Sequence, residues 1–335
     1  MPIRLRDVAD HAGVSVKTVS NVVNGYTHVS AATRERVEAS LAELDYRANI
    51  SARSLRTGRS GVFALAVPAL DMPYFAELTR YVVQEAETLG YTVLVDQTDG
   101  LREREHVVAT GLRSHLIDGL ILSPVAMDAS ELSALGGGTP IVLLGEKIDR
   151  APIDLVAFDN VAAARVATEH LLALGRRRIA AIGYQAEAEA LSGVATVRRA
   201  GYEQALRSAA VRVNPALTRE VHGYSRREGA SAMHSLLGEG PDAVLCFNDQ
   251  LALGALHTLS RQGVRVPEDV AVVGIDDIED GRFSTPTLST IAPDKASVAR
   301  EAVRLLHHRV ESPTSTSRRV SVGFELIPRE STLGR

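Results

Sequence analysis

Residues 5–25 read LRDVADHAGVSVKTVSNVVNG, a stretch built like two short helices joined by a tight turn. Val8, Ala9 and Ala12 place apolar groups on one face of the first helix, and Gly13 permits the turn. Ser15 can cap the second helix, because its side-chain oxygen can accept from the free backbone amides there. The pattern therefore predicts a small, all-α module in this part of the chain.

The second predicted helix has two distinct faces. At about 100° per residue, Val19, Val22 and Val23 group on one side, whereas polar residues that include Lys17 and Asn21 lie on the other. Lysine can donate to guanine or to phosphate, and asparagine can bond an adenine edge in two places. This face has the chemistry of a helix that reads bases in a major groove. Taken alone, the pattern also fits a helical hairpin with a merely solvated outer face.

The pattern continues well beyond these two helices. Residues 5–55 resemble, position after position, the headpiece of the lactose-repressor (LacI/GalR) family of bacterial transcription regulators. The matching positions are 7–9, 12–15, 18–20, 23–24, 28–30, 33–34, 37, 44–46 and 49–55. A resemblance of this length is specific, and it implies a helix-turn-helix headpiece that binds DNA.

The resemblance implies a role in DNA binding for particular positions. Val16, Lys17 and Asn21 would face the bases, and their difference from the tyrosine, glutamine and arginine of the family's lactose repressor implies a different operator sequence. The other implied DNA contacts in the headpiece are Ser15, Thr18, Asn24, His28, Ser30 and Thr33.

Residues 49–55 resemble the family's hinge helix, which orders on DNA. In that helix a leucine, here Leu55, enters between base steps of the minor groove, where an apolar wedge kinks the duplex. Asn49 and Ala52 belong to the same implied contact. The alternative is an ordinary linker that carries one exposed leucine.

Length and charge support a chain of several parts. With 335 residues and a hydrophobic content of 45%, the chain has enough residues beyond the headpiece for two more core-bearing units. Residues 1–60 hold nine Lys and Arg against six Asp and Glu, a net charge of +3, whereas the remainder holds 28 against 35, a net charge of -7. The positive charge therefore lies in the part that should meet nucleic acid.

Other features of the sequence indicate where the protein is located and whether it needs a cofactor. The first residues lack the apolar core of a secretory signal, and no apolar run approaches the roughly 18 residues of a membrane span. The single cysteine, Cys246, lies in the apolar run 243–247 and is expected to be a buried strand thiol. We expect a cytoplasmic protein with no membrane partner, metal or cofactor.

From residue 61 onward, short β-branched runs alternate with longer amphipathic segments, as in parallel sheets covered by helices. Strands are predicted at 62–68, 91–96, 119–123, 141–145, 155–158, 178–183, 243–247, 270–275 and 288–292. Helices are predicted at 74–89, 161–174, 196–210, 226–237, 249–262 and 296–308. Nine strands are many for one sheet of this length, so two doubly wound α/β lobes are expected.

The resemblance extends over this part as well, because it looks like the family's regulatory domain, whose architecture is that of periplasmic sugar-binding proteins. The implied domains are a helix-turn-helix headpiece at 1–48, a hinge helix and linker at 49–60, an N-terminal lobe at 61–160 and 292–321, and a C-terminal lobe at 161–291 and 322–335. Three crossings between the lobes would make a hinge, and such hinges commonly close around a ligand.

Ligands of open α/β sheets bind beyond the carboxyl ends of the strands. Polar residues follow predicted strands at 71, 159–160, 248–249 and 276–277. The resemblance implies effector contacts at Tyr74, Phe75, Arg198, Tyr224, Asn248 and Asp276. These side chains suit a sugar. The guanidinium of arginine donates hydrogen bonds from a forked pair of N–H groups, aspartate accepts from vicinal hydroxyls, and aromatic rings cover an apolar sugar face.

Each of these positions also has a structural interpretation. Phe75 and Tyr224 could be core aromatics, and Arg198 and Asp276 could pair with each other. Asp249 and Asp277 are expected to cap the helices that they precede. His170, His257, His307 and His308 show no metal-ligand pattern, and solvated helix faces are expected for them.

Two positions depart from the family's lactose repressor. Pro293 and Lys295 stand where that protein directs glutamine and phenylalanine toward its effector, so the identity of the ligand does not carry over.

The sequence as a whole predicts a homodimeric repressor of sugar-utilisation genes. It would bind a near-palindromic operator and be released by a small sugar. The alternative is an enzyme that processes a small sugar or nucleoside, with Asp276 and Asp277 as acid and base. Adjacent residues of an extended segment point in opposite directions, which disfavours that pair. The sequence leaves open whether the ligand releases or promotes DNA binding, and whether the regulator represses or activates.

Overall fold

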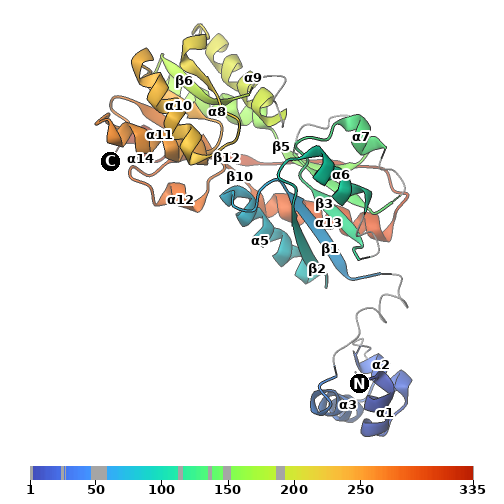
Figure 1. The fold of residues 1–335 in the computed structure, drawn as a ribbon. Coiled ribbons are helices and arrows are strands. Elements are labelled where there is room, and N and C mark those ends of the chain that lie inside the picture. Colours follow the sequence, from blue (N-terminus) through green and yellow to red (C-terminus); the bar gives the residue numbers. More distant parts are fainter. Residues whose placement is uncertain are drawn as a thin grey trace. The chain divides into compact units, whose positions relative to one another are not determined.

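The protein is described from a computed structural model, which covers residues 3–23, 26, 28–46, 59–111, 116–134, 138–145, 152–185 and 193–334. The chain divides into two compact units, Met1–Ser60 and Gly61–Arg335. We call the first unit the headpiece and the second unit the body. The headpiece contains helices α1 (Leu5–Ala12), α2 (Val16–Val23) and α3 (Ala31–Glu43) (Figure 1).

The headpiece has its own small apolar core. It is formed by the buried side chains of Val8, Ala9, Ala12, Val19, Val22 and Val37. The turn predicted at Gly13 is confirmed, and its φ of 63° is the left-handed conformation that glycine adopts readily. Val23 was predicted to join the buried face, and this was wrong, since it is 37% exposed. The buried stripe is centred between Val19 and Val22, and Val23 lies beyond its edge.

The first lobe of the body is built on a six-stranded, all-parallel sheet with the order β11-β5-β4-β3-β1-β2. Its strands are β1 (Val62–Val67), β2 (Thr92–Gln97), β3 (Gly119–Leu122), β4 (Ile141–Leu144), β5 (Asp154–Phe158) and β11 (Arg319–Val322). Its helices are α5 (Pro73–Thr88), α6 (Arg102–Thr110), α7 (Ala129–Ser133) and α13 (Lys295–Glu311). Helix α13 packs against α5 and against β3, β4 and β5.

The second lobe is built on a second six-stranded sheet, with the order β12-β10-β9-β8-β6-β7. Only the pair β10 and β12 is antiparallel. The strands are β6 (Ile179–Tyr184), β7 (Thr218–Glu220), β8 (Ala243–Cys246), β9 (Ala271–Ile275), β10 (Ser289–Pro293) and β12 (Phe324–Ile327). The helices are α8 (Asn160–Ala173), α9 (Gly193–Ser208), α10 (Arg226–Leu236), α11 (Asp249–Arg261), α12 (Glu279–Arg282) and α14 (Glu330–Leu333), with 3-10 turns η1 (Pro215–Leu217) and η2 (Leu237–Glu239).

The predicted fold class is confirmed, with a helical headpiece and a body of two parallel-sheet α/β lobes (Figure 1). All nine predicted strands and all six predicted body helices are present, with no end shifted by more than three residues. The short strands β7, β11 and β12 were not predicted. They lie at sheet edges, where an exposed face carries polar residues and breaks the apolar run.

The chain passes between the two sheets three times. It crosses after Phe158, after Pro293 and at Gly323. The backbone N–H of Asp294 donates to the carbonyl of Gly323 at 3.1 Å, so two of the crossings are hydrogen-bonded to each other. Strand β10 runs through Pro293, which puts this crossing after the predicted boundary at 292, and Val322 still pairs with Phe158 in the first sheet.

Some histidines are more enclosed than their helical positions suggested. A ring nitrogen of His170 lies 2.9 Å from the hydroxyl of Thr332, and His307 packs edge-on against the ring of Tyr91 at 5.8 Å. Solvated faces were the wrong prediction for these two, because His170 contacts Thr332 of α14 and His307 contacts Tyr91. The thiol of Cys246 is fully buried in β8, as predicted.

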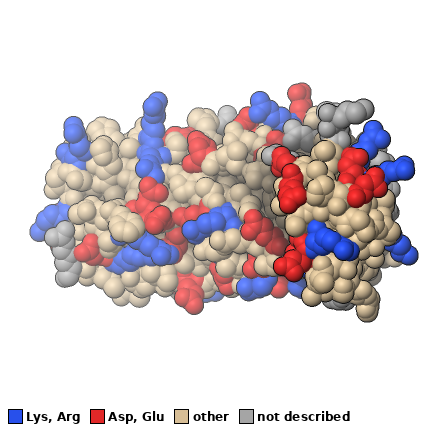
Figure 2. Space-filling view, turned by 90° about the horizontal axis from the view of Figure 1, so that it is seen from below, with Lys and Arg blue, Asp and Glu red and all other residues tan. Residues whose placement is uncertain are grey.

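Charge on the surface is mixed. Figure 2 shows one face of the molecule, on which acidic and basic side chains are interspersed instead of gathered into one patch of a single sign. Among the described helices, none combines the length and the apolar character needed to cross a membrane.

Close helix packing yields a first prediction. An ideal Cβ added to Gly254 of α11 would lie 2.0 Å from the carbonyl oxygen of Arg226 on α10. We expect Gly254→Ala to push these helices apart and to lower the free energy of unfolding by about 1–3 kcal/mol, measured by urea denaturation of the full chain. Gly238→Ala is the matched control, because nothing lies within 4 Å of an added Cβ there. Equal midpoints for the two variants would contradict the prediction.

Candidate functional site

A cavity of about 520 Å³ lies between the two lobes of the body and is lined by residues of both. In open α/β sheets such a position, beyond the carboxyl ends of the strands, is where ligands bind. The structure brings all six residues of the predicted effector set to this one cavity, namely Tyr74, Phe75, Arg198, Tyr224, Asn248 and Asp276.

Arg198 is the buried cation of the cavity. It projects from α9, and its Nε donates to the side-chain oxygen of Asn160 at 2.7 Å. A terminal nitrogen donates to the carbonyl of Phe247, and the other lies 3.8 Å from a carboxylate oxygen of Asp276. The structural pairing of Arg198 with Asp276 is therefore present. Because 3.8 Å is too long for a hydrogen bond, both groups keep capacity for a ligand.

Asp276 follows β9 at a turn with unusual backbone angles. Its φ is 126° and that of Asp277 is 49°, two consecutive positive values that cost non-glycine residues about 1–3 kcal/mol each. The Nζ of Lys295 donates to both carbonyls, at 2.7 Å for Asp276 and 3.0 Å for Asp277. Burial raises the pKa of Asp276 above its ordinary value, and the charges of Arg198 and Lys295 offset part of that effect.

Aromatic rings form another part of the cavity wall. Tyr74 and Phe75 begin α5, and their rings meet edge to face with centroids 5.2 Å apart. The hydroxyl of Tyr224 donates to the carbonyl of Gly183 at 3.2 Å. Burial raises the pKa of Tyr74, and it raises that of Tyr224 to about 12, so both hydroxyls stay neutral. All three rings are partly buried and line the cavity, so they are not enclosed within the core.

Asn248 both caps a helix and joins two loops. Its side-chain oxygen accepts from the N–H of Leu251, and its amide nitrogen donates to the carbonyl of Tyr224 at 3.2 Å. The prediction that Asp249 caps α11 was wrong, because Asp249 is already the first helical residue. Its buried carboxylate accepts from the hydroxyl of Thr290 at 2.7 Å and from the N–H of Ile278 at 3.0 Å.

Asp277 was also wrongly predicted to be a helix cap. Its carboxylate pairs with Arg282 and Arg329, each at 2.5 Å, and the residue before α12 is Ile278. Burial by itself would raise the pKa of Asp277, but hydrogen bonds from the two arginines lower it below the usual value. Asp277 therefore stays charged and ties together segments of the second lobe.

The structure adds residues that the predicted effector set lacks. Asn160 lines the cavity and receives Arg198, and its place directly after a strand was a usable signal. Pro293 and Lys295 are not among the residues that line the cavity. Lys295 points to Glu77 instead, with its Nζ 2.6 Å from a carboxylate oxygen, and nothing in the sequence links these two positions.

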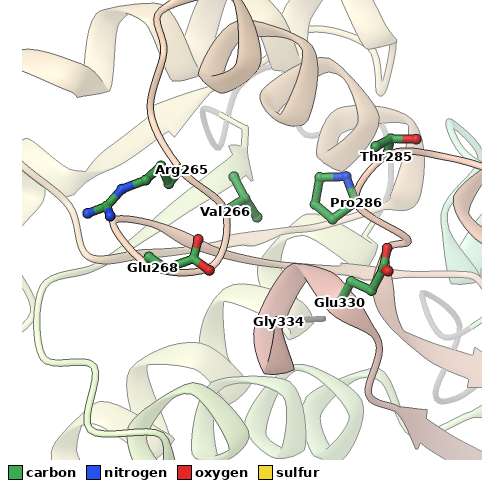
Figure 3. Close-up of a pocket in the computed structure, with 7 residues that line it drawn as sticks. All are labelled: Arg265, Val266, Glu268, Thr285, Pro286, Glu330 and Gly334. Atoms are coloured by element: carbon green, nitrogen blue, oxygen red, sulfur yellow. The ribbon is translucent and has the colours of Figure 1, made fainter.

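A second hollow of about 400 Å³ lies on the second lobe (Figure 3). It is lined by Arg265, Val266, Glu268, Thr285, Pro286, Glu330 and Gly334, none of which belongs to the predicted sites. Two of its charged groups are bound to neighbours, since Arg265 pairs with Asp269 at 2.5 Å and Glu330 accepts from the N–H of Thr287 at 2.9 Å. The interlobe cavity is therefore the better ligand site.

The headpiece presents the predicted reading face of α2 outward. Val16 is 44% exposed, Lys17 is exposed, and Asn21 is half-buried. Ser15 accepts from the N–H of Thr18 at 3.1 Å, which confirms the predicted cap.

The remaining headpiece positions of the predicted DNA surface fall into two groups. Ser30 accepts from the N–H of Thr33 at 3.3 Å, and His28 is exposed. The positions outside the described residues are Asn24, Asn49, Ala52 and Leu55.

The chain combines a helix-turn-helix unit with a two-lobed body that contains a polar cleft. This combination is typical of the class of ligand-responsive regulatory proteins. Residues 4–49 match the model of bacterial regulatory proteins of the lacI family, and residues 168–332 match that of the periplasmic binding protein-like domain. The chain is 35% identical over 343 residues to the lactose operon repressor of Escherichia coli (strain K12), with 99% of this chain and 91% of that protein covered. The chain therefore belongs to the LacI family of bacterial regulatory proteins.

Further relatives and solved structures agree with this assignment. The PurR transcriptional repressor of Haemophilus influenzae (strain PittEE) is 32% identical, with 98% of each chain covered. The structure titled as the lac repressor dimer bound to operator and the anti-inducer ONPF has a TM-score of 0.86 at 32% identity, with 99% of this chain and 100% of that chain covered. These relatives are transcriptional regulators, so the alternative of a sugar- or nucleoside-processing enzyme finds no support.

The cap of the reading helix yields a second prediction. We expect Ser15→Ala to destabilise α2 by about 1 kcal/mol, because the amide of Thr18 loses its side-chain acceptor. Hydrogen exchange of the α2 amides in the full chain should become faster. Ser15→Asp keeps an acceptor and serves as the control, so equal acceleration in both variants would rule out the capping role.

Proposed function

We propose that this protein is a homodimeric transcriptional repressor whose hold on a near-palindromic operator is controlled by a small sugar in the interlobe cavity. The observation that carries the proposal is the pair of buried charges on the cavity wall, Arg198 and Asp276, 3.8 Å apart beside the rings of Tyr74 and Phe75. A compact polar ligand with hydroxyl groups can form hydrogen bonds with both of these charged side chains.

The chemistry of the cavity favours a sugar as the effector. Arg198 donates to hydroxyl oxygens, and Asp276 accepts from hydroxyl protons. The rings of Tyr74 and Phe75 can cover the apolar face of a pyranose. A volume of about 520 Å³ lies within the range of small-molecule sites.

Some relatives carry names or titles that point the same way. The ribose operon repressor of Haemophilus influenzae (strain ATCC 51907 / DSM 11121 / KW20 / Rd) is 32% identical, with 98% of each chain covered. A structure titled as a complex of the transcriptional regulator CelR with cellobiose has a TM-score of 0.73 at 29% identity, with 98% of this chain and 99% of that chain covered. Planar nitrogen heterocycles also stack on aromatic rings, so they are the competing class of ligand.

The proposed DNA surface is the outward face of α2, with Val16, Lys17 and Asn21 toward the bases and Ser15 and Thr18 toward the backbone. One such helix makes few contacts. In a homodimer, the second headpiece binds at a high effective concentration, which yields useful affinity for two inverted half-sites. A dimer on operator DNA is what the lac repressor structure is titled to contain.

Control of DNA binding follows from the connections in the body. A ligand that binds one arrangement of the lobes more tightly shifts the population toward that arrangement. Because the chain crosses three times between the lobes, a change in their arrangement involves all three connections together. This coupling is the proposed route from the cavity to the operator.

A third prediction tests the effector. Among ribose, cellobiose, lactose and adenine, we expect a sugar to raise the melting temperature, because a ligand at a hundred times its Kd stabilises the folded state by about 2.7 kcal/mol. Arg198→Lys should weaken binding at least about tenfold, since the guanidinium fork is lost. Arg199→Lys is the control, because the adjacent Arg199 pairs with Glu203 at 2.8 Å and does not line the cavity. Stabilisation by adenine alone would replace the sugar by a heterocycle.

A fourth prediction tests the reading helix. Selection of bound duplexes from a random DNA library should recover two inverted half-sites. We expect Asn21→Ala to cost about 1–3 kcal/mol on the recovered sequence and to relax the preference at one base pair of each half-site. Asn214→Ala alters a cap in the body and should leave affinity unchanged. An equal loss on all sequences would assign Asn21 to the phosphates.

A further inference from the structure

Glu77 and Lys295 form a buried ion pair at the junction of the lobes. Glu77 lies on α5 and Lys295 is the first residue of α13, both in the first lobe. Their side chains are 22% and 10% exposed, and the Nζ of Lys295 is 2.6 Å from a carboxylate oxygen of Glu77. Removing two charges from water is costly, so a pair in such a place is a weak source of stability.

The same two side chains reach across to the second lobe. Lys295 donates to the carbonyls of Asp276 and Asp277, which follow β9. The other carboxylate oxygen of Glu77 accepts from the backbone N–H of Glu279 at 3.0 Å, at the start of α12. Figure 1 shows α12 of the second lobe near α5 of the first, in agreement with this contact.

The choice of lysine at position 295 fits this geometry. The chain contains 3 Lys, at positions 17, 147 and 295, against 34 Arg. An ammonium group has three donors that can converge on separate acceptors, and here three acceptors lie at 2.6, 2.7 and 3.0 Å. A planar guanidinium presents its donors in a fixed fork instead. A cation in the first helical turn also opposes the helix dipole, so the helix itself does not favour Lys295 there.

Lys295 contacts two residues that line the cavity. The carbonyl held by Lys295 belongs to Asp276, whose φ of 126° requires external support. The Nζ of Lys295 also lies 5.9 Å from the ring centroid of Tyr74. Lys295 itself does not line the cavity. It contacts the backbone of Asp276 and lies near the ring of Tyr74, and both of those residues line the cavity.

We propose that Glu77 and Lys295 form an interlobe clasp that positions Asp276 and Tyr74 for the effector and holds the start of α12 against α5. The positioning of effector contacts rests on the proposed function of the cavity. The clasp itself is a property of the protein without any ligand. Both residues are positioning residues, because neither lines the cavity.

The test measures backbone hydrogen exchange by mass spectrometry on the full, ligand-free protein. We expect Lys295→Met to speed exchange in residues 276–279 by at least about tenfold, because hydrogen bonds to a charged group are lost. Lys295→Arg keeps the charge but not the three-way geometry, so it should show most of the same increase. Glu77→Gln is the milder variant and should speed exchange of the Glu279 amide without unfolding the chain.

Glu301→Gln is the matched control. It removes the partner of Arg304, 2.6 Å away, in an ion pair on α13 itself, and should leave residues 276–279 unchanged. Unchanged exchange in the Lys295 variants would overturn the clasp. An increase that spreads evenly over β8 and β9 would overturn it too, because that pattern reports general destabilisation.

A second measurement separates the clasp from the proposed function. With cellobiose as the probe, we expect Lys295→Met and Lys295→Arg to raise the Kd about tenfold, whereas Glu301→Gln leaves it unchanged. An unchanged Kd together with localised exchange would keep the clasp and remove its positioning role. If the wild-type protein does not bind cellobiose, that result counts against this sugar as the effector, and the exchange data still decide the clasp.

Discussion

The body depends on one constraint of connectivity, which is that a single chain passes three times between two sheets. Each sheet ends its parallel strands toward the other, so the residues that follow those strands converge from both sides. Asn160, Arg198 and Asp276 of the second lobe therefore line the same cavity as Tyr74 and Phe75 of the first. The cavity exists because the crossings hold the lobes as neighbours.

Apolar runs in the sequence were sufficient to predict nine of the strands and the long amphipathic helices. They were insufficient for β7, β11 and β12, because TRE, RVSV and FELI mix polar with apolar residues at sheet edges. The six cavity residues were predicted from the family resemblance. That they lie at one cavity agrees with the rule that ligands bind beyond the carboxyl ends of parallel strands. Asp249, Asp277 and Lys295 could not be placed in the same way. Their roles depend on partners far apart in the chain. They also depend on the turn at residues 276–277, whose positive φ angles were not predicted because neither residue is a glycine.

Charged side chains from both lobes lie on and behind the cavity wall. Arg198 and Asp276 face the cavity, Lys295 holds the backbone of Asp276 from outside it, and Asp277 is fixed by Arg282 and Arg329. Asp249 lies in the same region, with a pKa raised by burial and by the nearby charge of Asp276. The carboxylates of Asp249 and Asp277 thus have their own hydrogen-bond donors, whereas Arg198 lies 3.8 Å from that of Asp276. A ligand that draws on Asp276 acts on a network that reaches α5, α12 and α14.

The position of β11 and β12 late in the sequence has a consequence for how the molecule is made. A chain that grows from its amino terminus completes β1 to β5 early, but the edge of that sheet beside β5 stays uncovered until residues 319–322 have been synthesised. The second sheet likewise waits for residues 324–327 to cover β10. Each sheet therefore gains its last strand only near the end of synthesis, from the neighbouring residues 319–327 of the nascent polypeptide.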